Sequence, residues 1–329
     1  MKLENIIKNF GNTNVLVIGD VMLDKNEIGS VKRVSPEAPV PVVLLKKKEY
    51  SIGGAANVAN NIASLGGKVS LVGVIGNDEY GKVLSEEIKK QGINFYDFKD
   101  NRKTTLKRRI FGNNQQICRI DEETDKKINN YLEEDIIDLV KKKIKEFDIL
   151  ILSDYNKGVL TERLTKDVIE IVNSEHKKVI VAPKRIEPSL GHFIESYLVC
   201  VNKHEAQNIT GITYENGNNK SLLKSLKSMG EKLVEIAKSE YAVITCGEDG
   251  MFSYSIIGNY DHVPTIALQV SDVTGAGDTV LATLALAINS KLNIHDASKL
   301  ANYAAGIKVQ KSGVQPVTKK ELIKYVKSL

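Results

Sequence analysis

Short runs of branched aliphatic residues alternate with amphipathic stretches along almost the whole chain, and this alternation limits the possible fold more than any other feature. Continuous apolar runs are typical of strands buried on both faces of a sheet, and they predict strands at 15–18, 69–74, 149–152, 179–181, 197–201 and 242–244. Helical spacing of apolar residues predicts helices at 55–65, 79–91, 132–147, 162–174, 222–237, 276–288 and 297–307. Because predicted strands and helices alternate along the chain, we expect an α/β fold with a mostly parallel sheet.

Two stretches depart from this rhythm and predict a second, smaller sheet. Residues 27–45 and 94–121 alternate polar and apolar side chains, as strands do when they bury only one face. We therefore expect a small antiparallel β lid from segments of about 25–46 and 94–121, with a turn at Gly112-Asn113-Asn114. Since no linker, repeat or low-complexity tract divides the chain, residues 1–329 are expected to form a single domain with this lid.

Composition excludes several classes of protein. The 46 Lys and Arg exceed the 41 Asp and Glu by only 5, without interleaved aromatic residues, so no nucleic-acid partner is expected. Cys118, Cys200 and Cys246 lack the spacing of a disulfide framework or a zinc site, and we expect them to be buried in a reducing compartment. The N-terminus has no signal-peptide pattern and no apolar run is long enough to span a bilayer. These observations predict a cytoplasmic protein without membrane contact.

The string Asp272-Val273-Thr274-Gly275-Ala276-Gly277-Asp278-Thr279 is the most informative motif. Small residues that open a helix expose backbone N–H groups at the positive end of the helix dipole, which suits a phosphate or a developing oxyanion. Asp278 falls in the first helical turn. There it is suited to act as a general base, but a carboxylate in that position also stabilises a helix start without any catalytic role.

Two other clusters likewise have both a binding and a structural interpretation. Gly53-Gly54 and Asn57 precede and open a helix of small residues, which favours either close approach of a polyhydroxylated substrate or tight helix packing. Asn202 and Glu205 begin another helix, where they would offer oxygen ligands to Mg²⁺ or form a capping box.

The ends of two predicted strands also carry candidate binding residues. Asp20 and Asp24 follow the first strand at the edge where open α/β sheets bind ligands, and buried acids there favour hydroxyl partners. The segment 245–250 would suit a loop beside a nucleotide, although by itself it predicts only a hairpin turn.

Taken together, these motifs resemble the ribokinase-like (PfkB) carbohydrate kinases over essentially the whole chain. The resemblance rests on the order and spacing of Gly53-Gly54 with Asn57, the stretch 76–81, Asn202 with Glu205, and the string 272–278. Segments 15–24, 34–42, 113–116, 153–158 and 272–274 are most similar to the D-glycero-β-D-manno-heptose 7-phosphate kinases of that family. The resemblance implies a ribokinase-like, doubly wound fold and ATP-dependent phosphorylation of the anomeric hydroxyl of the heptose 7-phosphate. The product would be the 1,7-bisphosphate, which supplies heptose to lipopolysaccharide or surface glycans.

The same resemblance implies a role for each matched position. Asp278 matches the catalytic base, and Gly275, Ala276 and Gly277 match the anion hole. The resemblance implies that Asp20, Gly53, Gly54, Asn57, Asp154 and Lys157 bind the sugar, and the basic lid adds Arg33, Lys107 and Arg109 to the expected sugar-binding residues. Those expected to bind ATP are Lys184, Asn202, Glu205, Thr245, Gly247, Asn302 and Gly306. Glu205 and Asn202 would also hold Mg²⁺ through water, and a monovalent cation is a further ligand that the resemblance allows.

The resemblance also implies partners, and it has one departure. A homodimer through the lid is expected, and the nucleotidylyltransferase that many such kinases carry as a C-terminal domain is expected on a separate polypeptide. The departure is at Ala182-Pro183-Lys184, where related kinases usually have Asp-Pro-Lys. A carboxylate near the expected phosphate site is therefore missing, which puts turnover and metal use in question.

Arginine placement favours an anionic substrate independently of the resemblance. The arginines in or beside the two lid segments are Arg33, Arg102, Arg108, Arg109 and Arg119. Their forked side chains suit phosphate oxygens, whereas the simpler interpretation is a solvated, charged lid. Two alternative functions remain: a PfkB-type kinase of another sugar, sugar phosphate or nucleoside, and a catalytically weak sugar- or nucleotide-binding regulator, which Ala182 favours.

Overall fold

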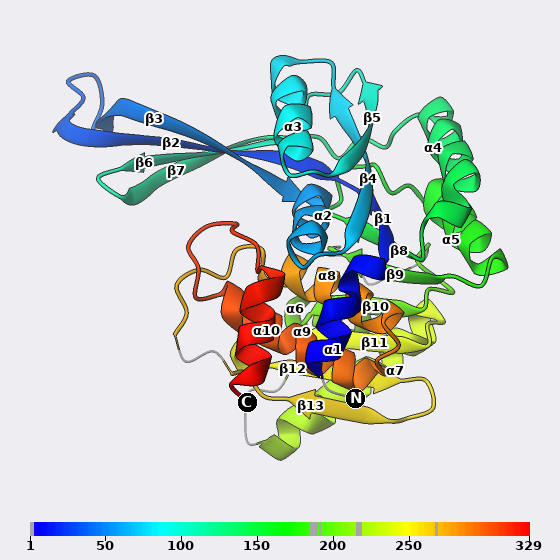
Figure 1. Ribbon diagram of the computed structural model, residues 1–329. Coiled ribbons are helices and arrows are strands. Elements are labelled where there is room, and N and C mark those ends of the chain that lie inside the picture. The colour runs from blue at the N-terminus through cyan, green and yellow to red at the C-terminus, as the bar shows by residue number, and fades with distance from the viewer. Residues whose placement is uncertain (1–2, 185–189, 191, 215–218, 267–268) are drawn as a thin grey trace.

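A nine-stranded sheet and a four-stranded sheet form the framework of the protein in a computed structural model (Figure 1). The structure describes residues 3–184, 190, 192–214, 219–266 and 269–329. The large sheet contains β1 (Asn14–Gly19), β4 (Lys68–Gly76), β5 (Asn94–Asp100), β8 (Ile149–Asp154), β9 (Lys178–Pro183), β10 (Leu198–Asn202), β11 (Tyr241–Thr245), β12 (Met251–Ser255) and β13 (Tyr260–Val263).

The strand order of the large sheet is β13-β12-β11-β10-β9-β8-β1-β4-β5. The strands from β11 to β5 are parallel, and β12 and β13 add an antiparallel edge. From β1 the chain builds β4 and β5 on one side and then returns to add β8 on the other. This reversal beside β1 is the position at which doubly wound sheets bind ligands, and it confirms the predicted fold.

Helices cover both faces of the large sheet. On one face lie α1 (Leu3–Lys8), α2 (Ala55–Ser64), α3 (Glu79–Lys90), α8 (Ala276–Asn289), α9 (Ile294–Lys308) and α10 (Lys319–Lys327). On the other lie α4 (Asn130–Lys143), α5 (Glu162–Ser174), α6 (Lys203–Thr210) and α7 (Asn219–Ala237). Alternate residues of β1 pack into the two cores: Val15 and Val17 into the first, Leu16 and Ile18 into the second. Burial on both faces explains why such strands have no polar side.

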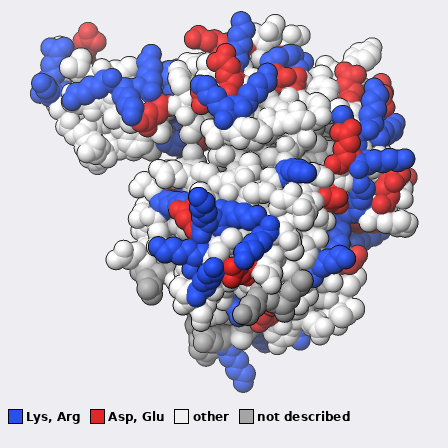
Figure 2. All heavy atoms as spheres, viewed as in Figure 1, with Lys and Arg blue, Asp and Glu red and all other residues white. Residues whose placement is uncertain are grey.

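The four-stranded sheet projects from the body in Figure 1 and in the space-filling view of Figure 2, and we call it the arm (residues 21–54 and 106–122). It consists of β2 (Val21–Val34), β3 (Pro41–Gly54), β6 (Leu106–Gly112) and β7 (Gln115–Glu122), in the order β3-β2-β6-β7. The pairs β2·β3 and β6·β7 are antiparallel hairpins, and the second turns at Asn113 and Asn114, both with positive φ, as predicted.

The extent of the predicted lid is wrong in one segment. Residues 94–100 form β5, an edge strand of the large sheet parallel to β4, rather than part of the lid. An edge strand exposes part of its surface, so it shows the same polar alternation as a lid strand. Both hairpins of the arm are antiparallel, as predicted for the lid, and a parallel pairing of β2 with β6 joins them.

Cys118 is exposed on β7, contrary to the prediction for all three cysteines, whereas Cys200 and Cys246 are buried. Because β7 is an edge strand of the arm with a largely exposed surface, Cys118 has no core to enter. Within the described part of the chain, no helix is both long and apolar enough to cross a membrane.

Candidate active site

A cavity of about 640 Å³ lies at the carboxyl edge of the parallel strands, where the arm leaves the body. Its wall includes Ser153 of β8, Ala182 of β9, Asn202 of β10 and Thr245 of β11. The cavity brings together most of the residues that the sequence singled out, namely Gly53, Gly54, Asn57, Lys107, Arg109, Lys184, Asn202, Glu205, Thr245, Gly247, Gly275, Gly277 and Asp278.

Asp278 lies in the first turn of α8 and is largely buried, with 7% of its surface exposed. Asn57 of α2 donates its Nδ2–H to Asp278 Oδ2 at 2.7 Å, and the Tyr155 hydroxyl donates to Asp278 Oδ1 at 2.7 Å. Lys184 Nζ lies 3.9 Å from the same Oδ1. Two donors and one cation thus orient this carboxylate at the wall of the cavity, where it could reach the proton of a bound hydroxyl group.

Tyr155 is a site residue to which the sequence assigned no role, although it lies inside the quoted segment 153–158. Burial raises the pKa of its hydroxyl well above the ordinary value of 10, so it remains a proton donor to Asp278. Lys184 Nζ lies 3.5 Å from the centre of the Tyr155 ring, in a cation–π contact. The ring therefore connects the cation at the end of β9 with the carboxylate on α8.

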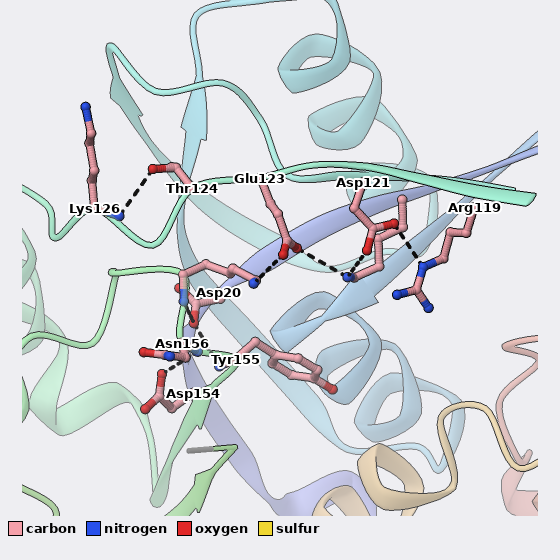
Figure 3. A network of polar contacts seen from close by, with 11 residues as sticks. Asp20, Arg119, Asp121, Glu123, Thr124, Lys126, Asp154, Tyr155 and Asn156 are labelled. Carbon is pink, nitrogen blue, oxygen red and sulfur yellow. Dashed lines mark hydrogen bonds and ion pairs between the residues drawn. The ribbon is translucent and has the colours of Figure 1, made fainter. Parts of the chain in front are cut away.

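Asp20 holds the loop that carries Tyr155 (Figure 3). Its carboxylate accepts backbone N–H groups from Tyr155 at 2.8 Å, Lys157 at 3.1 Å and Val159 at 3.2 Å. Burial, together with the nearby Asp154 carboxylate, raises the pKa of Asp20 to about 6. The structure thus places Asp20 beneath the site, outside the cavity wall, where it orders the loop rather than facing a sugar.

The start of α8 offers backbone donors to the cavity. Gly275 is the N-cap residue with φ +79°, and a Cβ there would lie 2.8 Å from Asn57 Nδ2, so only glycine suits this position. Within the described residues, the backbone N–H groups of Gly277 and Asp278 have no hydrogen-bond partner. Free N–H groups at a helix N-terminus are suited to bind anions. The N–H of Ala276, which the predicted anion hole included, is not among them, because it donates to the carbonyl of Val273.

Asn202 and Glu205 form the capping box of α6, so the structural interpretation of this pair holds. The Asn202 side chain accepts the N–H groups of His204 and Glu205, and Glu205 Oε2 accepts the N–H of Asn202 at 2.7 Å. Both residues also line the cavity, and burial raises the pKa of Glu205. With one carboxylate oxygen committed to the cap, the pair suits a hydrated Mg²⁺ held through water better than one enclosed by protein ligands.

Cations line the part of the cavity that faces the arm. Arg109 pairs with Asp24 at 2.5 Å, Lys107 lies 3.3 Å from both Asp121 and Glu123, and Arg119 pairs with Asp121 at 3.0 Å. Figure 3 shows Arg119, Asp121 and Glu123 in one continuous polar network. Asp24 and Arg119 also face the cavity, as their places after the first strand and in the basic lid suggested, although the resemblance gave neither of them a role.

The structure places several predicted binding residues away from the cavity wall. Arg33 is exposed far along β2, opposite Val42, so the expectation that it grips the sugar within one chain is not supported. Its strand continues outward past the residues that face the cavity, which the sequence does not reveal. Residues that also lie outside the wall are Asp20, Asp154, Lys157, Ala276, Asn302 and Gly306.

These outlying residues have structural partners. Asp154 is buried and accepts the N–H of Asn156, and Lys157 Nζ pairs with Glu123 at 2.8 Å. Asn302 donates to the carbonyl of Pro264. Arg102 and Arg108 are held at the base of the arm, by Asp100 and by Glu27 with Tyr80, respectively. Of the five lid arginines, Arg109 and Arg119 are therefore the two that line the cavity and could contact a ligand there.

On the opposite side of the cavity, Thr245 is the last residue of β11 and Gly247 lies in the turn that joins β11 to β12, which confirms the predicted hairpin. Lys203 and His204 of α6 join them in the wall, and no sequence argument singled them out. Lys203 Nζ lies 4.8 Å from the Tyr214 ring centre and 3.7 Å from Asp249. Their only sequence signal is their place between Asn202 and Glu205.

Comparison with known proteins matches residues 12–321 to the family described as pfkB family carbohydrate kinase. The chain is 42% identical over 318 residues to "Bifunctional protein HldE" of Aliarcobacter butzleri, covering 96% of this chain and 65% of that protein. It is 40% identical over 301 residues to "Bifunctional protein HldE" of Helicobacter pylori, covering 91% of this chain and 63% of that protein. The chain thus spans somewhat less than two thirds of the length of these relatives.

Solved structures share the fold at low sequence identity. Arabidopsis thaliana ribokinase, complexed with ribose and ATP, superposes with a TM-score of 0.73 at 18% identity, covering 96% of this chain and 99% of that one. Escherichia coli phosphofructokinase-2, in complex with potassium, gives a TM-score of 0.74 at 16% identity, covering 96% and 98%.

Proposed function

The chain belongs to the pfkB family of carbohydrate kinases, and we propose that it transfers the γ-phosphoryl group of ATP to the anomeric hydroxyl of D-glycero-D-manno-heptose 7-phosphate. The observation that carries the proposal is that the two ends of one cavity have different chemistry. Asp278 with the free N–H groups of α8 lies at one end, and the basic residues of the arm lie at the other. A sugar phosphate has the matching polarity: a hydroxyl at one end and an anion at the other.

In this mechanism, the acceptor hydroxyl lies against Asp278, which takes its proton as the new O–P bond forms and the bond from the γ-phosphorus to the β,γ-bridging oxygen breaks. The N–H groups of Gly277 and Asp278 would donate to the oxygens of the transferring phosphoryl group. Lys184, 3.9 Å from Asp278 Oδ1, adds positive charge between donor and acceptor. ADP leaves with the electrons of the broken bond.

Mg²⁺, bound with the nucleotide, would neutralise charge on the β- and γ-phosphates. Glu205 and Asn202 would hold its water ligands, since both line the cavity at the start of α6. The nucleotide itself would lie against Thr245 and Gly247, on the side of the cavity opposite the arm.

Lys107, Arg109 and Arg119 are proposed to bind the distal phosphate. Each is paired with a carboxylate, so an incoming phosphate would exchange these partners for its own oxygens. The similarity to proteins named HldE supports the heptose among the sugar phosphates. The proposed product, the 1,7-bisphosphate, would supply heptose to lipopolysaccharide or surface glycans.

We also propose a homodimer through the arm. Six large apolar side chains are exposed there: Val34, Val40, Leu44, Leu45, Ile117 and Ile120. Exposed apolar patches on a projecting sheet are typical of protein interfaces. Sedimentation velocity should show a dimer for the wild type and a monomer for Leu44→Lys.

The function is tested by ADP release with Mg-ATP and a panel of phosphorylated and unphosphorylated heptoses, hexoses and nucleosides. The highest kcat/KM is expected with heptose 7-phosphate, and phosphorus NMR should show an anomeric phosphate. A higher kcat/KM with a nucleoside or an unphosphorylated sugar would refute the substrate assignment. Absence of turnover with every acceptor would favour the regulator, for which Ala182 is the supporting feature.

Arg119→Ala and Arg33→Ala form a matched pair for the distal phosphate, because both side chains are exposed on the arm and Arg119 alone of the two lines the cavity. Arg119→Ala should weaken heptose 7-phosphate binding by about 1.5–3 kcal/mol, the range for hydrogen bonds to charged groups, while Arg33→Ala should leave it unchanged. Equal losses in both variants would instead indicate that the arm of a second copy reaches this site.

A further inference from the structure

Lys308, the last residue of α9, is a fully buried lysine that the mechanism above does not use. Its Nζ donates to the carbonyl oxygen of Gly313 at 2.8 Å, and no carboxylate of the described residues lies within ion-pair distance. Burial lowers the pKa of this ammonium. Removing a lysine from water is costly, so a chain that keeps one here must gain from its charge or its hydrogen bonds.

Lys308 lies directly behind the loop of the anion hole. A Cβ on Gly275 would lie 3.8 Å from Lys308 Cε, which places the lysine stem against the N-cap of α8. The carboxylates that attract its charge are those of Asp272 and Asp278, at the two ends of the same string of small residues.

Asp272 joins this loop to the segment that follows Lys308. Asp272 Oδ1 accepts the N–H of Thr274 at 2.8 Å, and Oδ2 accepts the N–H of Gly313 at 2.9 Å. The N–H groups of Ser271 and Asp272 both donate to the carbonyl of Val309. Lys308 completes the connection by donating to the Gly313 carbonyl. The Lys308 ammonium and the Asp272 carboxylate therefore hold the loop before α8 and the segment after α9 together, behind the proposed phosphoryl site.

The sequence resemblance allowed for a monovalent cation, but three oxygens beside this loop already accept protein donors. Both oxygens of Asp272 accept N–H groups, and the Gly313 carbonyl accepts Lys308. We propose that the Lys308 ammonium is a built-in cation that positions and charges the anion-hole loop, so that this kinase needs no monovalent cation. The proposal rests on the proposed phosphoryl transfer at Asp278, and it makes Lys308 a positioning residue that touches no substrate.

The test compares wild type, Lys308→Ala and Lys308→Met, with Lys311→Ala as the matched control. Lys311 is on the same segment, and its Nζ bonds to the Pro316 carbonyl and to Glu321, away from the anion hole. Turnover and thermal unfolding are measured in choline, potassium and ammonium chloride at equal ionic strength.

Wild type and Lys311→Ala should show the same kcat in all three salts. Lys308→Ala should lose about tenfold in kcat in choline. A direct oxyanion donor is worth about 10²–10³-fold, and a charge behind the loop is expected to contribute less. Ammonium or potassium should restore much of that loss and raise the unfolding temperature of Lys308→Ala, by entering the space that the side chain leaves. Lys308→Met should stay inactive in every salt, since the methionine fills that space without charge.

A wild-type kcat that rises severalfold with potassium would overturn the proposal, as would a folded Lys308→Ala within threefold of wild type in choline. These failures differ from failure of the proposed function, which would appear as wild-type inactivity with every acceptor. In that event the unfolding measurements still test the proposal. A rise in the unfolding temperature with ammonium in Lys308→Ala, but not in wild type or Lys311→Ala, would support a built-in cation. The lack of such a rise would overturn the proposal.

Discussion

Asp278→Asn separates a catalytic carboxylate from one that merely starts a helix. Asn57 Nδ2 can still donate to the amide oxygen of the new side chain, and the Tyr155 hydroxyl can rotate to accept from its amide nitrogen. Two charge-assisted hydrogen bonds become neutral ones, so we expect a loss of about 1–2 kcal/mol in the free energy of unfolding. The variant can no longer accept the proton of the acceptor hydroxyl. A positioned base contributes about 10²–10⁴-fold, equivalent to about 3–5 kcal/mol of activation free energy.

The assay measures sugar-dependent ADP release, ATP affinity by calorimetry and thermal unfolding on one preparation. Asp296→Asn is the matched control, because Asp296 lies in the first turn of the following helix, α9, and does not line the cavity. We expect kcat to fall at least a hundredfold in Asp278→Asn alone, with ATP affinity little changed in either variant. A folded Asp278→Asn with kcat within a few-fold of wild type would show that Asp278 only stabilises the start of α8, and the catalytic assignment would fall.

Three further predictions concern residues around this carboxylate. Ala182→Asp should restore an acid in the cavity wall and lower the Mg²⁺ concentration for half-maximal activity; a change confined to the sugar KM would show that position 182 faces the sugar instead. Tyr155→Phe removes one of the two donors to Asp278 and should lower kcat about tenfold, the value of one hydrogen bond, while an unchanged kcat would make the contact incidental. Because burial raises the folded-state pKa of Asp20 from 3.8 to about 6, its contribution to the free energy of unfolding should fall by about 3 kcal/mol as pH rises through that window. Urea titrations across this range should show that slope in wild type and not in Asp20→Asn, and equal slopes would contradict the assignment.

Local chemistry was enough to predict most of the elements. The helices at 79–90 and 162–174 begin at Asp78 and Thr161, whose side chains accept backbone N–H groups as capping residues do. The strands at 15–18 and 149–152 contain only apolar residues because both faces of the large sheet are covered. In each case the deciding interactions lie within a few residues or depend on burial alone, so one sequence suffices to find them.

The misassigned features depend on pairing, which the sequence does not record. The alternation of polar and apolar residues in 94–100 correctly predicts a strand with one buried face, but it does not indicate which sheet the strand joins. Similarly, the basic lid predicts that Arg33 and Arg109 both bind the sugar. In the structure, Arg109 pairs with Asp24 beside the cavity, whereas Arg33 lies near the exposed end of β2. How far along a hairpin the ligand lies is set by the register of the strands.

The contacts around Asp278 show why its orientation depends on segments distant in the chain. Asp20 lies between β1 and β2, directly before β2 leaves the body to form the arm, and its carboxylate also holds the loop with Tyr155. Tyr155 in turn donates to Asp278, which lies 123 positions later on α8. A disturbance at Asp20 is therefore expected to reach the base through the loop, without any contact between Asp20 and substrate. It follows that a fall in kcat on changing Asp20 does not identify it as a sugar ligand, whereas a fall in sugar affinity at unchanged kcat would.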